Sequence, residues 1–354
     1  MNQLFPQQKP GLKPGTKTRL QPSRPNDSIR YTAAMSQQRL DELHARLRDT
    51  GYIADRSLLV SLDLMQMLGK PLLLEGEAGV GKTGIATSLA AALGAELIRL
   101  QCYEGLDAQQ VLYDWDYQRQ LLTIQMMRAK ADNSTESTPS PLLSPDTDNM
   151  QREIYSEQYL LKRPLFKAIS HDGPCVLLID EIDRADEEFE ALLLEVLAEN
   201  QVTVPELGTY TATSKPLVIL TSNAIRNLSD ALRRRCLYHY IDFPTPYKER
   251  QIVHARLPQI DDALAGQVVS LVQRLRQQTL AKKPGVAETL DWLAALYALD
   301  VKDLRDAPEE LAHSLPALLK TRVDQQTVEQ EQFLQTWLGE TTEQSESAES
   351  SEPV

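Results

Sequence analysis

The sequence has few cysteines and no long apolar run. Its 354 residues include three cysteines, Cys102, Cys175 and Cys236, which lie far apart in or beside apolar segments. This pattern argues against a disulfide framework and indicates buried thiols in a reducing compartment. No cysteine–histidine spacing resembles a zinc site, and no apolar stretch approaches the roughly 20 residues of a membrane span. We therefore expect a cytoplasmic protein without a membrane segment.

Basic residues are also in the minority. The chain has 37 basic and 50 acidic residues, for a net charge of -13. Binding along nucleic acid needs a basic surface, and no stretch interleaves basic with aromatic residues. The sequence therefore argues against nucleic acid as the main partner.

Both ends of the chain are polar and lack a hydrophobic period. Residues 1–34 carry a net charge of +5, and residues 339–354 hold five glutamates without a base. We expect a disordered basic arm and a disordered acidic tail. Met35 opens the first periodic segment and is an alternative candidate for the start of translation.

Short apolar runs and helical patterns alternate between these ends. The runs predict five strands, at 70–76, 96–102, 175–183, 216–223 and 237–243. Several are apolar on both faces, as in a buried parallel sheet. Helical patterns separate most of them, at 82–93, 158–170 and 186–199. We expect a doubly wound α/β domain over 35–246, followed by a small all-helical domain over 247–338.

Two insertions enlarge the predicted α/β domain. Residues 103–160 separate the second and third strands, and WDYQRQLLTIQ (115–125) within them is interpreted as a hairpin. Residues 201–212 predict a second hairpin. Three aromatic residues, Tyr113, Trp115 and Tyr117, gather in the first insertion, where they either anchor it to the domain or grip a partner.

An octapeptide after the first predicted strand carries the strongest functional signal. It consists of Gly76, Glu77, Ala78, Gly79, Val80, Gly81, Lys82 and Thr83, and fits G-x-x-x-x-G-K-[ST] between a strand and a helix. Inward-turned backbone N–H groups and the helix N-terminus suit the phosphates of ATP. Lys82 is expected to reach the β- and γ-phosphates, and the Thr83 hydroxyl to bind Mg²⁺.

Polar residues end two further predicted strands. CVLLIDEID ends in Asp180 and Glu181, at the edge where open α/β sheets bind ligands. We expect Asp180 to bind Mg²⁺ and Glu181 to orient the attacking water as a base. PLVILTSN ends in Asn223, which is predicted to place an amide between the octapeptide and Glu181.

Three consecutive arginines close SDALRRRC. They cannot all face one nucleotide, so we expect an arginine finger that enters a neighbouring subunit's site, with Arg235 the first candidate and Arg234 the second. The alternative is a solvated basic helix end.

Taken in this order, the motifs resemble those of the AAA+ ATPases, over about residues 45–320. LLIDEIDRADEEFEALLLEVLAENQVTV and the two insertions are similar to the MoxR branch, and TSNAIRNLSDALRRRC and KKPGVAETLDW resemble its CoxD-like members. The resemblance implies a homo-oligomeric ring, usually a hexamer, and a von Willebrand A domain partner. It also implies a client such as a molybdenum hydroxylase, for example carbon monoxide dehydrogenase.

The resemblance also assigns two further positions. Gln101 stands where such proteins keep a polar residue that restrains the catalytic glutamate; the alternative is a simple strand end. The lid stretch Pro284–Glu288 lacks the arginine that many relatives direct at the γ-phosphate, and Lys282 or Lys283 is its candidate substitute.

We therefore expect ATP hydrolysis in a ring that remodels or matures a client protein. The alternatives are a nucleic-acid-dependent motor and a non-hydrolysing assembly adaptor gated by ATP.

Overall fold

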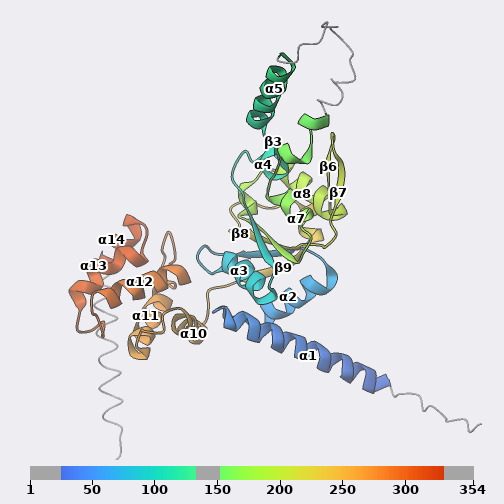
Figure 1. Cartoon of the computed structure of the whole chain (residues 1–354). Coiled ribbons are helices and arrows are strands. Elements are labelled where there is room, and N and C mark those ends of the chain that lie inside the picture. The colour runs from blue at the N-terminus through green and yellow to red at the C-terminus, as the bar shows by residue number, and fades with distance from the viewer. Residues whose placement is uncertain (1–24, 133–151, 331–354) are drawn as a thin grey trace, which may run out of the picture.

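A computed structural model describes residues 25–132 and 152–330 (Figure 1). A five-stranded parallel sheet forms its centre, in the order β2-β5-β8-β1-β9. The strands are β1 (Leu72–Gly76), β2 (Glu96–Gln101), β5 (Cys175–Asp180), β8 (Leu217–Ser222) and β9 (Leu237–Ile241). All five predicted strands and the doubly wound α/β class are confirmed.

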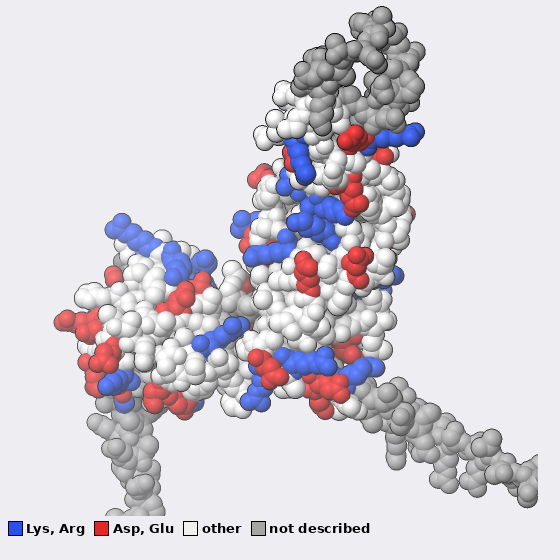
Figure 2. Space-filling model, in the orientation of Figure 1, with Lys and Arg blue, Asp and Glu red and all other residues white. Residues whose placement is uncertain are grey.

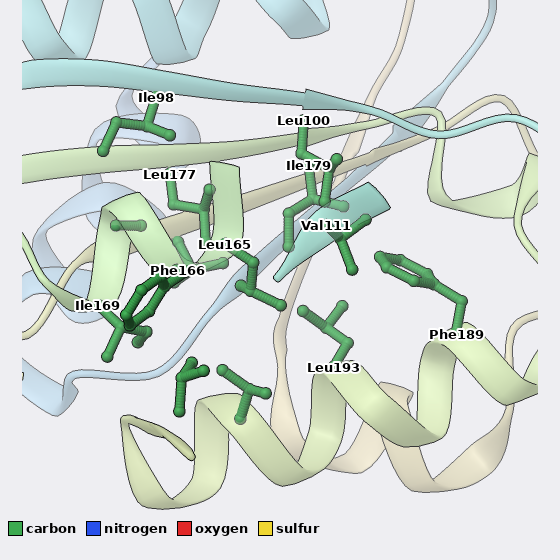
Figure 3. Packing of buried hydrophobic residues seen from close by; sticks show 14 of the residues in the cluster. Ile98, Leu100, Val111, Leu165, Phe166, Ile169, Leu177, Ile179, Phe189 and Leu193 are labelled. Carbon is green, nitrogen blue, oxygen red and sulfur yellow. The ribbon is translucent and has the colours of Figure 1, made fainter. Parts of the chain in front are cut away.

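Helices cover both faces of this sheet. They are α1 (Pro25–Asp49), α2 (Arg56–Leu68), α3 (Lys82–Leu93), α7 (Pro164–Ile169), α8 (Glu187–Glu199) and α9 (Asp230–Arg235). Side chains alternate between the faces along each strand. On one side, Leu72 and Leu74 of β1 join the buried cluster of α1, α2 and α3. On the other, strand residues meet α7 and α8: Figure 3 shows Leu177 and Ile179 of β5 near Phe166 and Leu193.

The insertion after β2 differs from its prediction. It contains α4 (Ala108–Val111), β3 (Tyr113–Trp115), α5 (Tyr117–Asp132), a 3₁₀ turn (Glu157–Tyr159) and β4 (Leu160–Lys162). The hairpin expected at 115–125 is wrong, because β3 pairs with β4 and a helix lies between them. Asp116 begins that helix by accepting from the Arg119 backbone N–H at 3.1 Å. The following run of Gln, Leu, Met and Arg then favours a helix.

The helix expected at 158–170 is likewise too long. Leu160–Lys162 is strand β4, and the helix begins only at Pro164. A proline disfavours helical backbone in the preceding residue, and Arg163 is extended at φ -89° and ψ 171°. The hairpin expected at 201–212 is confirmed as β6 (Gln201–Val204) and β7 (Gly208–Thr211).

The aromatic cluster of the insertion divides into two parts. Trp115 is buried and contacts the Tyr155 ring edge-on at 5.2 Å, and Tyr113 packs against Phe166 at 6.5 Å. Tyr117 is exposed on α5, which points away from the sheet at the end opposite α1 (Figure 1). Two of the three rings therefore anchor the insertion.

The ends of the chain also need one correction. Helix α1 begins at Pro25, so residues 25–34 are helical and not the disordered arm expected there. Proline fits the first turn of a helix, and Ala33 and Ala34 favour continuing it. The rest of that arm, residues 133–151 of the first insertion, residues 331–338 of the predicted helical domain and the acidic tail lie outside the described residues.

A helical lid follows the sheet, as predicted. Its helices are α10 (Pro246–Arg256), α11 (Asp262–Leu275), α12 (Val286–Ala298), α13 (Pro308–Leu318) and α14 (Arg322–Gln330). They enclose their own apolar cluster around Trp292, whose indole N–H donates to Ser314 at 2.8 Å. Among the described helices, none combines the length and apolar character of a membrane span.

Candidate functional site

The octapeptide forms a tight loop between β1 and α3. Gly79 and Gly81 have positive φ of 79° and 95°, which glycine adopts without a steric penalty. The loop leaves the backbone N–H groups at the start of α3 without helical partners, and this arrangement suits an anion. Lys82 is buried, and its ammonium donates to the carbonyls of Gly76 and Glu77, both at 2.7 Å. Burial lowers the pKa of Lys82, and nearby carboxylates led by Asp183 oppose that shift.

Thr83 and Asp180 lie together beside this loop. The Thr83 hydroxyl donates to Asp180 Oδ1 at 3.1 Å, and Thr221 of β8 donates to the same oxygen at 2.5 Å. Asp180 is buried at the end of β5. Hydroxyl and carboxylate oxygens are ligands that Mg²⁺ accepts. The two residues predicted for the metal therefore meet, and their oxygens fit it.

Glu181 stands next to Asp180 in a left-handed conformation, with φ 56°. Such backbone is uncommon outside glycine and is found at functional sites. Its backbone N–H donates to Thr221, and its carboxylate receives the Gln101 amide at 3.0 Å and Arg184 at 2.9 Å. The expected contact between Gln101 and Glu181 is thus present. Both donors contact the same oxygen, Oε2, of a side chain that is 29% exposed.

Asn223 connects the end of β8 to the loop. Its amide oxygen accepts from Lys82 at 2.8 Å. Its backbone N–H and that of Ile225 both donate to one oxygen of buried Asp183, at 3.0 and 2.9 Å. Asp183 therefore fixes the turn that carries Asn223 toward Lys82.

The three arginines of α9 face different surroundings. Arg233 pairs with Glu75 of β1 at 3.3 Å and is half-buried. Arg234 is 82% exposed and lies 3.8 Å from exposed Asp230. Arg235 is exposed, and its side chain has no hydrogen bond or ion pair with any residue in 25–132 or 152–330. Arg233 thus anchors the helix, which leaves Arg234 and Arg235 directed outward.

A cavity of about 290 Å³ opens beside the loop, between the sheet domain and the lid. Its lining comes from the α1–α2 connection, the loop, the end of β9, α10 and α12, and includes Tyr52, Ile53, Val80, Ile252, Arg256 and Leu290. Small-molecule sites are typically concave and mostly apolar, with a few polar groups. This cavity suits a flat, mostly apolar group joined to phosphates on the loop.

The lid touches the loop through its backbone. Val286 N–H donates to the Gly79 carbonyl at 3.0 Å, and the Glu288 carboxylate accepts from Gly285 N–H at 3.1 Å. Arg276, in a buried pair with Glu249, donates to the Pro284 carbonyl at 2.8 Å and so anchors this segment from behind. Lys282 and Lys283 are exposed, and the residues that reach the loop are Gly285, Val286 and Glu288.

Gly285→Ala is expected to weaken nucleotide binding about tenfold, from an overpacking cost of about 1–3 kcal/mol. The new Cβ would lie 2.7 Å from Gly79 Cα, so the lid must move away from the loop and open the cavity. Gly285 has φ -83°, so alanine introduces no backbone strain of its own. Titration with a fluorescent ATP analogue measures the change. Gly266→Ala in α11 is the control, because its Cβ meets Arg250 only at 3.7 Å and beyond; equal affinities in both variants would contradict the role of this contact.

The motifs do not predict several residues of the site. Thr221 and Arg99 each stand two residues before a predicted site residue on the same strand, so strand alternation offers a signal for both. Asp183 is polar inside an otherwise buried segment, which is a second signal. The cavity residues give no local signal, because five separate segments supply them.

Comparison with known proteins finds similarity over part of the chain. Residues 71–236 match the AAA domain of the dynein-related subfamily. Over 118 residues the chain is 34% identical to Chaperone MoxR1 of Mycobacterium tuberculosis, covering 31% of this chain and 30% of that protein. It is 24% identical to the denitrification regulatory protein NirQ of Stutzerimonas stutzeri, covering 59% and 64%. The matches thus span less than two thirds of either relative. Residues 71–236 are thus similar to an AAA domain.

The chain is also similar to solved structures, at low sequence identity. A P216G mutant of Thermotoga maritima RuvB matches with a TM-score of 0.40 and 17% identity, over 73% of this chain and 67% of that one. A putative ATPase from Cytophaga hutchinsonii matches with a TM-score of 0.40 and 16% identity, over 88% and 97%.

Proposed function

We propose that the protein is a MoxR-type AAA+ ATPase that hydrolyses ATP in a ring of several copies and remodels or matures a client protein. One observation carries the proposal: beside the loop, Lys82 donates to Asn223, Thr83 donates to Asp180, and Glu181 directly follows Asp180. The AAA domain match covers all five residues.

The residues divide the reaction among them. Lys82 and the loop N–H groups bind the phosphates, and the cavity takes the base. Thr83 and Asp180 would hold Mg²⁺, which would offset charge on the phosphates. Glu181 orients a water and accepts its proton as the water oxygen bonds to the γ-phosphorus, and the bond to the bridging oxygen breaks to leave ADP. Asn223 positions that water together with Lys82.

We further propose that the active site is completed by a neighbouring copy. Arg235 is outward and unpaired within the described part of the chain, as an arginine finger acting in trans requires. The resemblance to MoxR and CoxD-like proteins supports a hexamer, a von Willebrand A domain partner and a molybdenum hydroxylase client as the finer form of the proposal.

The surface supports a protein client over nucleic acid. Figure 2 shows a group of basic side chains on the sheet domain with acidic side chains at its edges, and this group does not continue as a basic band onto the lid. A net charge of -13 points the same way, because nucleic-acid binding depends on counterion release by clustered basic groups.

The test is hydrolysis by the purified full-length chain. With ATP and Mg²⁺ we expect release of ADP and phosphate, and EDTA should reduce the release to the background level. DNA should not change the rate. An assembled protein that binds ATP without hydrolysing it would instead be an adaptor, and salt-sensitive stimulation by DNA would indicate a nucleic-acid motor.

A further inference from the structure

Arg99 reaches the predicted metal ligand from the edge strand β2. Residues 99 and 101 lie on one face of the strand, and Gln101 is in register with Asp180 of β5. The Arg99 guanidinium contacts Asp180 Oδ2 at 2.5 Å, and the same nitrogen donates to the Gln101 amide oxygen at 2.9 Å. One cation thus touches both Asp180 and Gln101.

This cation and a metal ion need the same carboxylate. Asp180 Oδ1 already accepts from Thr83 and Thr221, and Oδ2 lies 3.3 Å from Thr83 and 2.5 Å from Arg99. A divalent cation between Thr83 and Asp180 would therefore meet the positive charge of Arg99 within a few ångströms. Asp180 is 5% exposed and cannot turn away, whereas Arg99 is 53% exposed and can move into water at small cost.

The Gln101 amide links this contact to the predicted base. Its oxygen accepts from Arg99 and its nitrogen donates to Glu181 Oε2 at 3.0 Å. With both ends engaged, the amide is held in one orientation. When Arg99 leaves, the oxygen loses its donor, and the amide can turn and release Glu181.

We propose that Arg99 is a positioning residue that competes with Mg²⁺ for Asp180 and, through Gln101, couples arrival of the metal to release of Glu181. The inference rests on the proposed ATPase function and adds an order of events to it: Gln101 releases the base once the metal has displaced Arg99, while the contact between Arg184 and Glu181 stays in place.

The experiment titrates Mg²⁺ against a fluorescent ADP analogue bound to the full-length protein, so that no hydrolysis intervenes. Arg99→Gln should lower the Mg²⁺ midpoint about three- to tenfold, because the competing charge is gone. Arg99→Lys, which keeps the charge, should stay closer to wild type. The control is Arg163→Gln, another half-exposed arginine, whose partner Asp114 lies in the insertion at 3.5 Å; its midpoint should not move.

A second variant tests the link through the amide. Gln101→Ala should keep the wild-type Mg²⁺ midpoint, because the pair between Arg99 and Asp180 persists, while hydrolysis at low Mg²⁺ rises relative to hydrolysis at saturating Mg²⁺. An unchanged or higher Mg²⁺ midpoint in Arg99→Gln, with the protein folded by circular dichroism, overturns the inference alone. Absence of any metal-dependent nucleotide binding in wild type would instead overturn the proposed function.

Discussion

Arg235→Ala is expected to lower the rate of ATP hydrolysis about 10³-fold or more, the usual contribution of an arginine finger, and to leave ATP affinity nearly unchanged. The reason is its position: Arg235 is exposed at the end of α9, while Arg233 beside it is engaged by Glu75. A group supplied to a neighbour's transition state contributes little to binding in its own subunit. Phosphate release at saturating ATP measures the rate, and the fluorescent analogue measures affinity.

Arg234→Ala is the matched control for that variant. Arg234 occupies the same helix end, is 82% exposed and lies near Asp230, so it shares the charge but not the assigned role. If only Arg234→Ala lost ATP hydrolysis, Arg234 and not Arg235 would be the arginine finger. Full activity in both variants would show that α9 contributes only a basic helix end.

Glu181→Gln is expected to slow hydrolysis about 10²- to 10⁴-fold, the contribution of a positioned general base. Glutamine has the same shape and can still approach Gln101 and Arg184, but it cannot accept the proton of the attacking water. ATP binding should persist, because the loop, Lys82 and Thr83 are untouched. Single-turnover phosphate release reports the rate, and Glu188→Gln, an exposed change in the first turn of α8, serves as the control. A Glu181→Gln protein with wild-type turnover would exclude Glu181 as the base.

Mixing the two variants separates a site within one subunit from a shared site. Arg235→Ala retains Glu181, and Glu181→Gln retains Arg235, so an interface between them can contain both groups. Random equimolar rings should recover about a quarter of wild-type activity, because one interface in four then combines the intact residues. If the mixture is no more active than the separate variants, the two residues do not act across one interface.

The site residues near strand ends could be predicted because their positions follow from local rules. The loop sits between β1 and α3, and Asp180 and Asn223 follow apolar strands whose carboxyl ends share one sheet edge. The contacts of Thr221 and Arg99 depend instead on which strand lies beside which. Registers such as that between Gln101 and Asp180 are not encoded in spacing along the chain.

The insertion shows the opposite case, in which local reasoning chose the wrong structure. Aromatic and branched residues between Trp115 and Ile124 suggested strands, but the capping contact of Asp116 and the helix-forming run after it favour α5. Strand β3 then finds its partner at Trp115↔Leu160, beyond the helix. The paired residues are far apart in the sequence, so local sequence patterns could not predict this pairing.

The contact between Gly79 and Gly285 tolerates few substitutions. Each side presents main chain, and a Cβ on either glycine would come within about 3 Å of the other. The volume of the side chain therefore matters more at these two positions than its polarity or charge, and both positions require a residue without a Cβ. A change in the shape of the loop therefore acts directly on the main chain of the lid at Gly285 and Val286.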